Sequence, residues 1–133
     1  LLQSAHWDVA EELAAYSLND SKLRLKIMNN FENPEDTKLA TLASATLKRS
    51  GAQQAAALRD TTGRTYVAIN IETKSLQLNA LEAVFTVALA SQITGIESVV
   101  YTGEITAPTQ LIREYAPRAS IFYLSANGDI VTL

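Results

Sequence analysis

Hydrophobic residues recur at helical spacing through the first fifty residues of the chain. The pattern predicts three helices, over residues 6–17, from residue 20 or 21 to 29, and from residue 36 or 37 to 48. Pro34 separates the second from the third, because proline biases its predecessor away from the helical conformation. Gly51 can end the third helix. We expect the first two helices to form a hairpin on the rest of the protein or on a partner.

Beyond Gly51 the pattern changes to short strands and one long apolar helix. Strands at 55–58 and 65–71 flank Asp60-Thr61-Thr62-Gly63, which is typical of a β-hairpin. Residues 78–93 are apolar almost all round, which predicts a central helix covered on several sides. Further strands are expected at 96–101, 119–124 and 130–133, with a short helix from Pro108 to Tyr115 and a tight turn at Asn127-Gly128.

This order predicts an α/β sandwich with a mixed sheet of about five strands flanked by helices. The first strand pair should be antiparallel, and the two later β-α-β crossovers parallel and right-handed. We divide the chain into an N-terminal helical extension, residues 1–34, and an α/β domain, residues 35–133.

The composition of the chain argues against some classes of binding partner. The 133 residues are enough for one domain, 47% are hydrophobic, and the net charge is −3. No basic stripe with interleaved aromatics is present, which argues against nucleic acid, and no apolar stretch is long enough to cross a membrane. Leu1-Leu2-Gln3 does not resemble a signal peptide, so we interpret it as the trimmed end of a longer chain and expect a cytoplasmic protein.

The candidate chemistry is sparse. Asn70 and Glu72 lie two residues apart, on one face at the end of a predicted strand, where they could contact a small molecule or only bond loop amides. Glu82 and Glu104 could pair for acid–base chemistry or a hard metal, although solvated surface carboxylates are commoner. The chain has no cysteine, and its one histidine, His6, is expected to be a half-exposed helix residue.

The hairpin carries a resemblance to a known family. Ala56-Ala57-Leu58, then Gly63-Arg64 five residues on, then Asn70-Ile71-Glu72 and an apolar helix, resemble the A-A-L, G-R and N-x-E pattern of the cytidine deaminase family. The resemblance covers about residues 36–133. It implies a three-layer sandwich, and assembly into dimers or tetramers.

The resemblance also assigns roles to positions. Asn70 and Glu72 match the residues that bind the ribose hydroxyls in the family. The first zinc ligand falls on Asn79 and the catalytic glutamate on Leu81; an alternative register puts them on Ala80 and Glu82. The two cysteines of the P-C-x-x-C motif fall on Ile105 and Pro108.

At the matched positions this chain lacks the residues that the zinc chemistry of that family requires. Hydrolytic deamination needs Zn²⁺ on three His or Cys ligands, and a glutamate that transfers protons. We therefore expect no metal, no cofactor and no catalytic residue, and a binding, regulatory or oligomeric scaffold module that accepts a nucleoside-like molecule. The alternatives are an interaction protein with no ligand, and a hydrolase of the nucleoside deaminase class with relocated chemistry.

Overall fold

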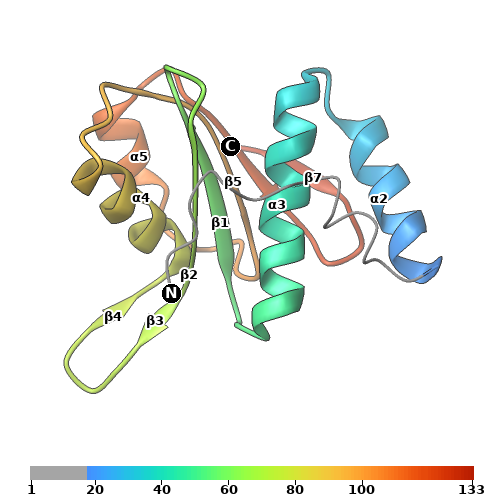
Figure 1. Cartoon of the computed structure of the whole chain (residues 1–133), viewed down its shortest axis with the longest axis horizontal. Helices are drawn as coiled ribbons and strands as arrows, with labels where there is room; N and C mark the ends of the chain where they lie inside the picture. The colour runs from blue at the N-terminus through green and yellow to red at the C-terminus, as the bar shows by residue number, and fades with distance from the viewer. Residues whose placement is uncertain (1–17) are drawn as a thin grey trace.

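The computed structural model of the chain describes residues 18–133 (Figure 1). The predicted helix over residues 6–17 lies outside them. The helices are α2 (Leu18–Asn30), α3 (Pro34–Ser50), α4 (Ala80–Ala90) and α5 (Gln110–Tyr115). The strands are β1 (Ala55–Asp60), β2 (Thr65–Ile69), β3 (Ile71–Glu72), β4 (Gln77–Leu78), β5 (Ile96–Thr102), β6 (Ser120–Leu124) and β7 (Ile130–Thr132).

Five strands form the central sheet, in the order β2-β1-β5-β6-β7. β1 is antiparallel to both β2 and β5, so these two strands run parallel to each other on either side of it. β5 and β6 form a parallel pair, and β7 returns antiparallel to β6. The mixed sheet, its antiparallel first pair and the two parallel crossovers through α4 and α5 are therefore as predicted.

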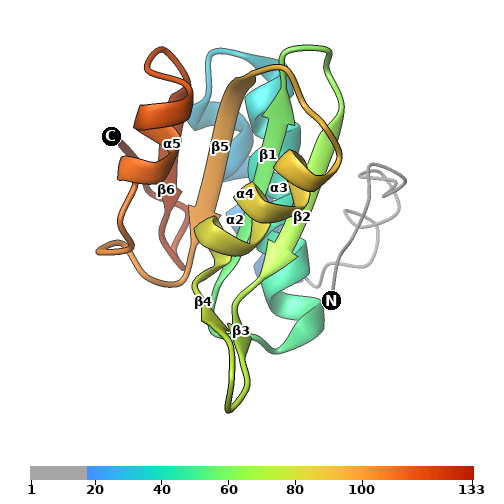
Figure 2. The same cartoon turned by 90° about the vertical axis from the view of Figure 1, so that its left-hand side faces the viewer.

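The helices cover both faces of the sheet, with α2 and α3 on one side and α4 and α5 on the other (Figures 1 and 2). All six residues of β1 are buried, because this strand lies between the two helical layers. Ala56 and Leu58 belong to the core beneath α4 and α5, whereas Ala57 belongs to the core beneath α3. Ile27 of α2 is 1% exposed in that second core, so α2 is packed onto the α/β domain.

Helix α3 begins earlier than the sequence predicted. Asn33 is its N-cap and accepts a hydrogen bond from the Glu35 amide at 2.9 Å, while Pro34 occupies the first helical turn. Proline is tolerated there because its missing N–H would have no partner within the helix. The prediction that Pro34 lies between two helices is thus wrong, and α3 starts two or three residues before the predicted residue 36 or 37.

Helix α4 is shorter and less covered than predicted. Leu78 belongs to β4, and the helix ends at Ala90 rather than at residue 93. Leu89 is 38% exposed and Phe85 is half-buried, so one side of α4 is open in the described chain.

Strand β2 also ends earlier than predicted, at Ile69 instead of residue 71. Ile71 and Glu72 pair with Leu78 and Gln77 in a separate hairpin, β3–β4, which projects beyond the body of the protein (Figures 1 and 2). Asn70 and Glu72 are therefore not neighbours on one face of a single strand. Among residues 18–133, no helix is both long and apolar enough to cross a bilayer.

Candidate functional site

A pocket of about 250 Å³ opens where β1 begins, β2 ends and α4 begins. It brings Asn70 and Glu72 together with Asn79 and Glu82. The remaining lining residues come from the segment before β1 and from the projecting hairpin: Gln53, Gln54, Ile71, Gln77 and Leu78. The wall is therefore dominated by amide and carboxylate side chains.

Gln54 connects the elements that form this pocket. Its backbone N–H donates to Oδ1 of Asn70 at 2.9 Å, and its carbonyl accepts the Asn70 N–H at 3.3 Å. Its side-chain Oε1 accepts the N–H of Ala80, in the first turn of α4, at 3.0 Å. Gly103 allows this packing, because a Cβ there would overlap the carbonyl oxygen of Gln53. The sequence interpretation missed Gln53 and Gln54, although two consecutive polar residues before an apolar strand could have signalled them.

Asn79 and Glu82 hold the start of α4 through a capping box. Oδ1 of Asn79 accepts the Glu82 N–H at 2.8 Å, and Oε1 of Glu82 accepts the Asn79 N–H at 2.9 Å. This exchange satisfies two backbone donors that a helix N-terminus otherwise leaves unpaired. Both residues therefore have a structural task, which leaves the Asn79 amide nitrogen and one Glu82 oxygen facing no partner among residues 18–133.

Asn70 and Glu72 keep most of their polar capacity for other molecules. Asn70 is half-buried and uses only its oxygen, in the contact with Gln54. The Glu72 carboxylate is exposed, without a hydrogen-bond partner in the described part of the chain. An amide nitrogen donates and a carboxylate accepts, so together they suit a ligand with hydroxyl groups, which can do both.

Three positions assigned by the resemblance lie outside this pocket: Leu81, Ile105 and Pro108. Leu81 is 1% exposed, in the core between α4 and the sheet. Ile105 is 44% exposed, and its carbonyl accepts the Tyr101 hydroxyl at 2.9 Å. Pro108 is exposed ahead of α5, and neither Ile105 nor Pro108 lines the pocket. The alternative pair, Ala80 and Glu82, takes part in the bonds that fix the helix start.

Glu104 is separate from Glu82 in its contacts. Its carboxylate accepts from the Thr106 hydroxyl at 2.8 Å and from the Thr106 amide at 3.2 Å, and these bonds hold its pKa below the ordinary value. It does not line the pocket. Within residues 18–133, no group of three or more His, Cys, Asp or Glu side chains is placed to hold a metal ion.

Comparison with known proteins identifies the family. Residues 32–128 match the sequence model of a family described as cytidine deaminase-like. The chain belongs to the cytidine deaminase-like family. The match extends over most of the α/β domain, including β1, β2 and α4, which surround the pocket.

Solved structures agree with this family in fold. The cytidine deaminase of Burkholderia pseudomallei is 20% identical, with a TM-score of 0.59, over 71% of this chain and 88% of that one. The cytidine deaminase of Mycobacterium leprae is also 20% identical, with a TM-score of 0.55, over 76% of this chain and 94% of that one. At this identity the likeness establishes a cytidine deaminase-like fold and nothing about activity. A search of curated proteins finds no match.

Proposed function

We propose that this member of the cytidine deaminase-like family is a non-catalytic module that binds a nucleoside-like molecule in the pocket around Asn70 and Glu72. The observation that supports this proposal is a difference between the residues matched to sugar binding and the residue matched to catalysis. Asn70 and Glu72, which match the sugar-binding positions of the family, retain a free donor and free acceptors. The position matched to the catalytic glutamate, Leu81, is apolar and buried.

The donor set of the chain argues against the family's metal chemistry. The whole sequence contains no cysteine and a single histidine, so three soft ligands for Zn²⁺ cannot come from one chain. Neither Ile105 nor Pro108 has a side-chain atom that binds a metal. The purified protein should therefore bind no stoichiometric zinc and release no ammonia from cytidine. One zinc per chain, or ammonia release above the rate in buffer, would contradict the proposal.

A nucleoside panel tests the binding half of the proposal. Cytidine, uridine and adenosine are titrated against the full chain, with free ribose and free cytosine as partial ligands, and the melting temperature is recorded. A ligand that binds only the folded state stabilises it by about 2.7 kcal/mol at one hundred times its Kd. We expect a nucleoside to raise the melting temperature.

Glu72→Ala should abolish this increase, because it removes the exposed acceptor of the pocket. Glu114→Ala removes an exposed carboxylate from α5, away from the pocket, and should leave the response unchanged. The absence of a shift with any nucleoside, or an equal loss in both variants, would reject the ligand assignment.

A scaffold role is the second candidate, and the open side of α4 favours it. Phe85 packs edge to face on Tyr115, with ring centroids 5.6 Å apart, and Leu89 lies exposed on the same helix. A second copy of the chain could cover this apolar side, as in the dimers or tetramers that the family resemblance implies. Light scattering should then give twice or four times the mass of 14.4 kDa, and Leu89→Lys should reduce it to the monomer.

A further inference from the structure

A second, larger cavity lies at the opposite end of the central sheet. Its volume is about 440 Å³, and it shares no lining residue with the pocket at Asn70. It forms where β1 ends and β5 begins, against the loop that joins α5 to β6. Its floor is mainly apolar, made by Ile96, Ala116, Pro117 and Ala119. Small-molecule pockets in proteins typically have volumes of about 300–1,000 Å³.

The walls of this cavity are fixed by hydrogen bonds from elsewhere in the fold. Arg113 donates to the carbonyls of Pro117 at 3.2 Å and Ala119 at 2.5 Å, which holds the α5–β6 loop in place. The Tyr115 hydroxyl donates to the Ile93 carbonyl at 3.2 Å, which fixes the aromatic wall. Because all three bonds go to backbone carbonyls, the cavity is shaped before any ligand arrives.

Opposite charges border the apolar floor. Arg118 is exposed and has no ion-pair or hydrogen-bond partner in residues 18–133. Glu97 is half exposed and uses only Oε1, which accepts from Arg59 Nη2 at 2.9 Å and from Nε at 3.3 Å. Its second oxygen has no partner in the described chain.

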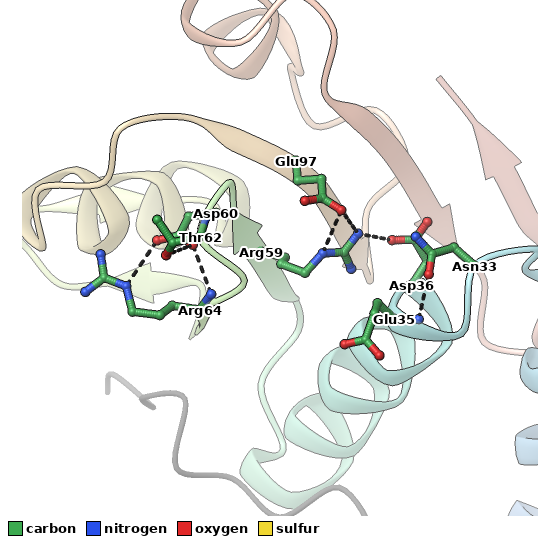
Figure 3. Close-up of polar contacts among 8 residues, drawn as sticks. All are labelled: Asn33, Glu35, Asp36, Arg59, Asp60, Thr62, Arg64 and Glu97. Atoms are coloured by element: carbon green, nitrogen blue, oxygen red, sulfur yellow. Dashed lines mark hydrogen bonds and ion pairs between the residues drawn. The ribbon is translucent and has the colours of Figure 1, made fainter.

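A β-bulge explains why the Glu97 side chain lies at this rim. Arg59 pairs with Ser98 and Asp60 with Ile96, so Glu97 is the extra residue between them on β5. A bulge bends its strand and redirects the side chain of the extra residue. Figure 3 shows the Glu97 carboxylate turned toward Arg59, which also binds Asp36 at 2.8 Å. Two carboxylates thus share one guanidinium, and the group stays net negative.

We infer that this cavity binds a small zwitterion with an apolar body, namely a free amino acid or a dipeptide with apolar side chains. The ligand carboxylate pairs with Arg118, the ammonium group pairs with the free oxygen of Glu97, and the apolar part lies on Ile96 and the α5–β6 loop. A ligand of one charge would satisfy one rim group and meet repulsion from the other, whereas a zwitterion satisfies both.

Titration of the ¹⁵N-labelled full chain with four probes tests the inference. The probes are L-leucine, the dipeptide Leu-Leu, N-acetyl-L-leucine and L-leucinamide. We expect the two zwitterions to shift the amide signals of Thr61, Gly95, Glu97 and the α5–β6 loop. The acetylated and amidated probes should bind about tenfold or more weakly, because each lacks one charged contact. The zwitterion that saturates at the lower concentration distinguishes an amino acid site from a dipeptide site.

Matched variants assign the effect to the cavity. Arg118→Gln should weaken zwitterion binding about tenfold, whereas Lys22→Gln, which removes an exposed cation from α2, should not. Asn70→Ala should leave it unchanged, so the result is independent of the nucleoside proposal. The inference is overturned if neither zwitterion shifts these signals, if the capped probes bind as tightly as L-leucine, or if Arg118→Gln binds like the unmodified chain.

Discussion

The two ends of strand β1 differ in how far the hydrogen-bonding capacity of their buried and half-buried polar side chains is used within the protein. At the Asp60 end, buried charges bond to one another and to the backbone (Figure 3). Arg59 is 4% exposed and contacts Asp36 and Glu97, and Asp60 is fully buried with hydrogen bonds from Thr62 and Arg64. Burial alone would lower the pKa of Arg59, but its bonds to the two carboxylates outweigh burial and raise that pKa.

At the Gln54 end, polar groups are only half used. In each of Gln54, Asn70 and Asn79 the side-chain oxygen accepts a hydrogen bond from a backbone N–H. All three residues line the open pocket, and their amide nitrogens have no hydrogen-bond partner within residues 18–133. Buried polar groups of folded proteins are almost always paired. The comparison therefore separates the buried Arg59 and Asp60, whose contacts stabilise the fold, from the polar residues around Asn70, which have capacity left for a ligand.

The largest expected effect concerns the buried ion pair. Asp36→Ala leaves Arg59 buried with only the half-exposed Glu97, and should lower the free energy of unfolding by about 3 kcal/mol. Glu35→Ala is the matched control, because it removes a neighbouring carboxylate from the same helical turn. Within residues 18–133 the Glu35 carboxylate pairs with the exposed Lys38, at 3.1 Å, so this loss should be at most about 1 kcal/mol. Urea unfolding measures the free energy of unfolding of both variants. Equal losses for Asp36→Ala and Glu35→Ala would contradict a structural role for the Asp36–Arg59 ion pair.

A smaller effect, with a pH signature, is expected at Asp60. Burial by itself raises its pKa, but hydrogen bonds from Thr62 and Arg64 outweigh burial and hold the pKa below the ordinary value. The unfolded chain therefore takes up the proton first, near pH 4. The stabilisation is complete above that pH and is lost as the pH falls through the lower pKa of the folded state.

Asp60→Asn should cost about 2 kcal/mol at pH 7, because it removes charge-assisted bonds. The difference between Asp60→Asn and the unmodified chain should then narrow below about pH 4, as the unmodified chain loses this contribution. Urea midpoints at pH 7, 5, 4 and 3 give the measurement. Parallel curves for the two proteins would show that Asp60 does not contribute through its charge.

The smallest expected effect is at Asn79, whose oxygen stabilises the fold while its amide nitrogen has no partner in residues 18–133. Asn79 caps α4 with its oxygen, so Asn79→Ala should lower the free energy of unfolding by about 1 kcal/mol. Asn79→Asp keeps the capping oxygen and adds a favourable charge at the helix N-terminus, so its stability should be close to the original. If Asp were as costly as Ala in thermal unfolding, the amide nitrogen of Asn79 would have a structural partner, and Asn79 would not belong to the half-used group.

Much of the fold could be predicted because it follows from local patterns. The hairpin around Gly63 and the final turn at Asn127-Gly128 each depend on residues close together in sequence, and the parallel β5–β6 pair follows from the order strand, short helix, strand. The element ends that were predicted wrongly, the start of α3 and the end of β2, depend on contacts that the local sequence does not decide. Pro34 reads equally as a helix break or a first-turn residue, and the Asn33 cap decides between them. Asn70 leaves β2 because its side chain and backbone both bond Gln54, sixteen residues earlier.

The sequence by itself determined the resemblance to the family and the set of possible metal donors, which includes no cysteine and one histidine. Composition is independent of packing, so no fold of one such chain can supply three soft metal ligands. Only the tertiary structure decided which polar groups are already satisfied. Satisfaction depends on partners brought together from distant segments, as Gln54 meets Ala80 and Arg59 meets Asp36. The cavity beside Arg118 could not be predicted for the same reason, because its walls come from three stretches that are far apart in the sequence, at residues 61, 95–97 and 115–119.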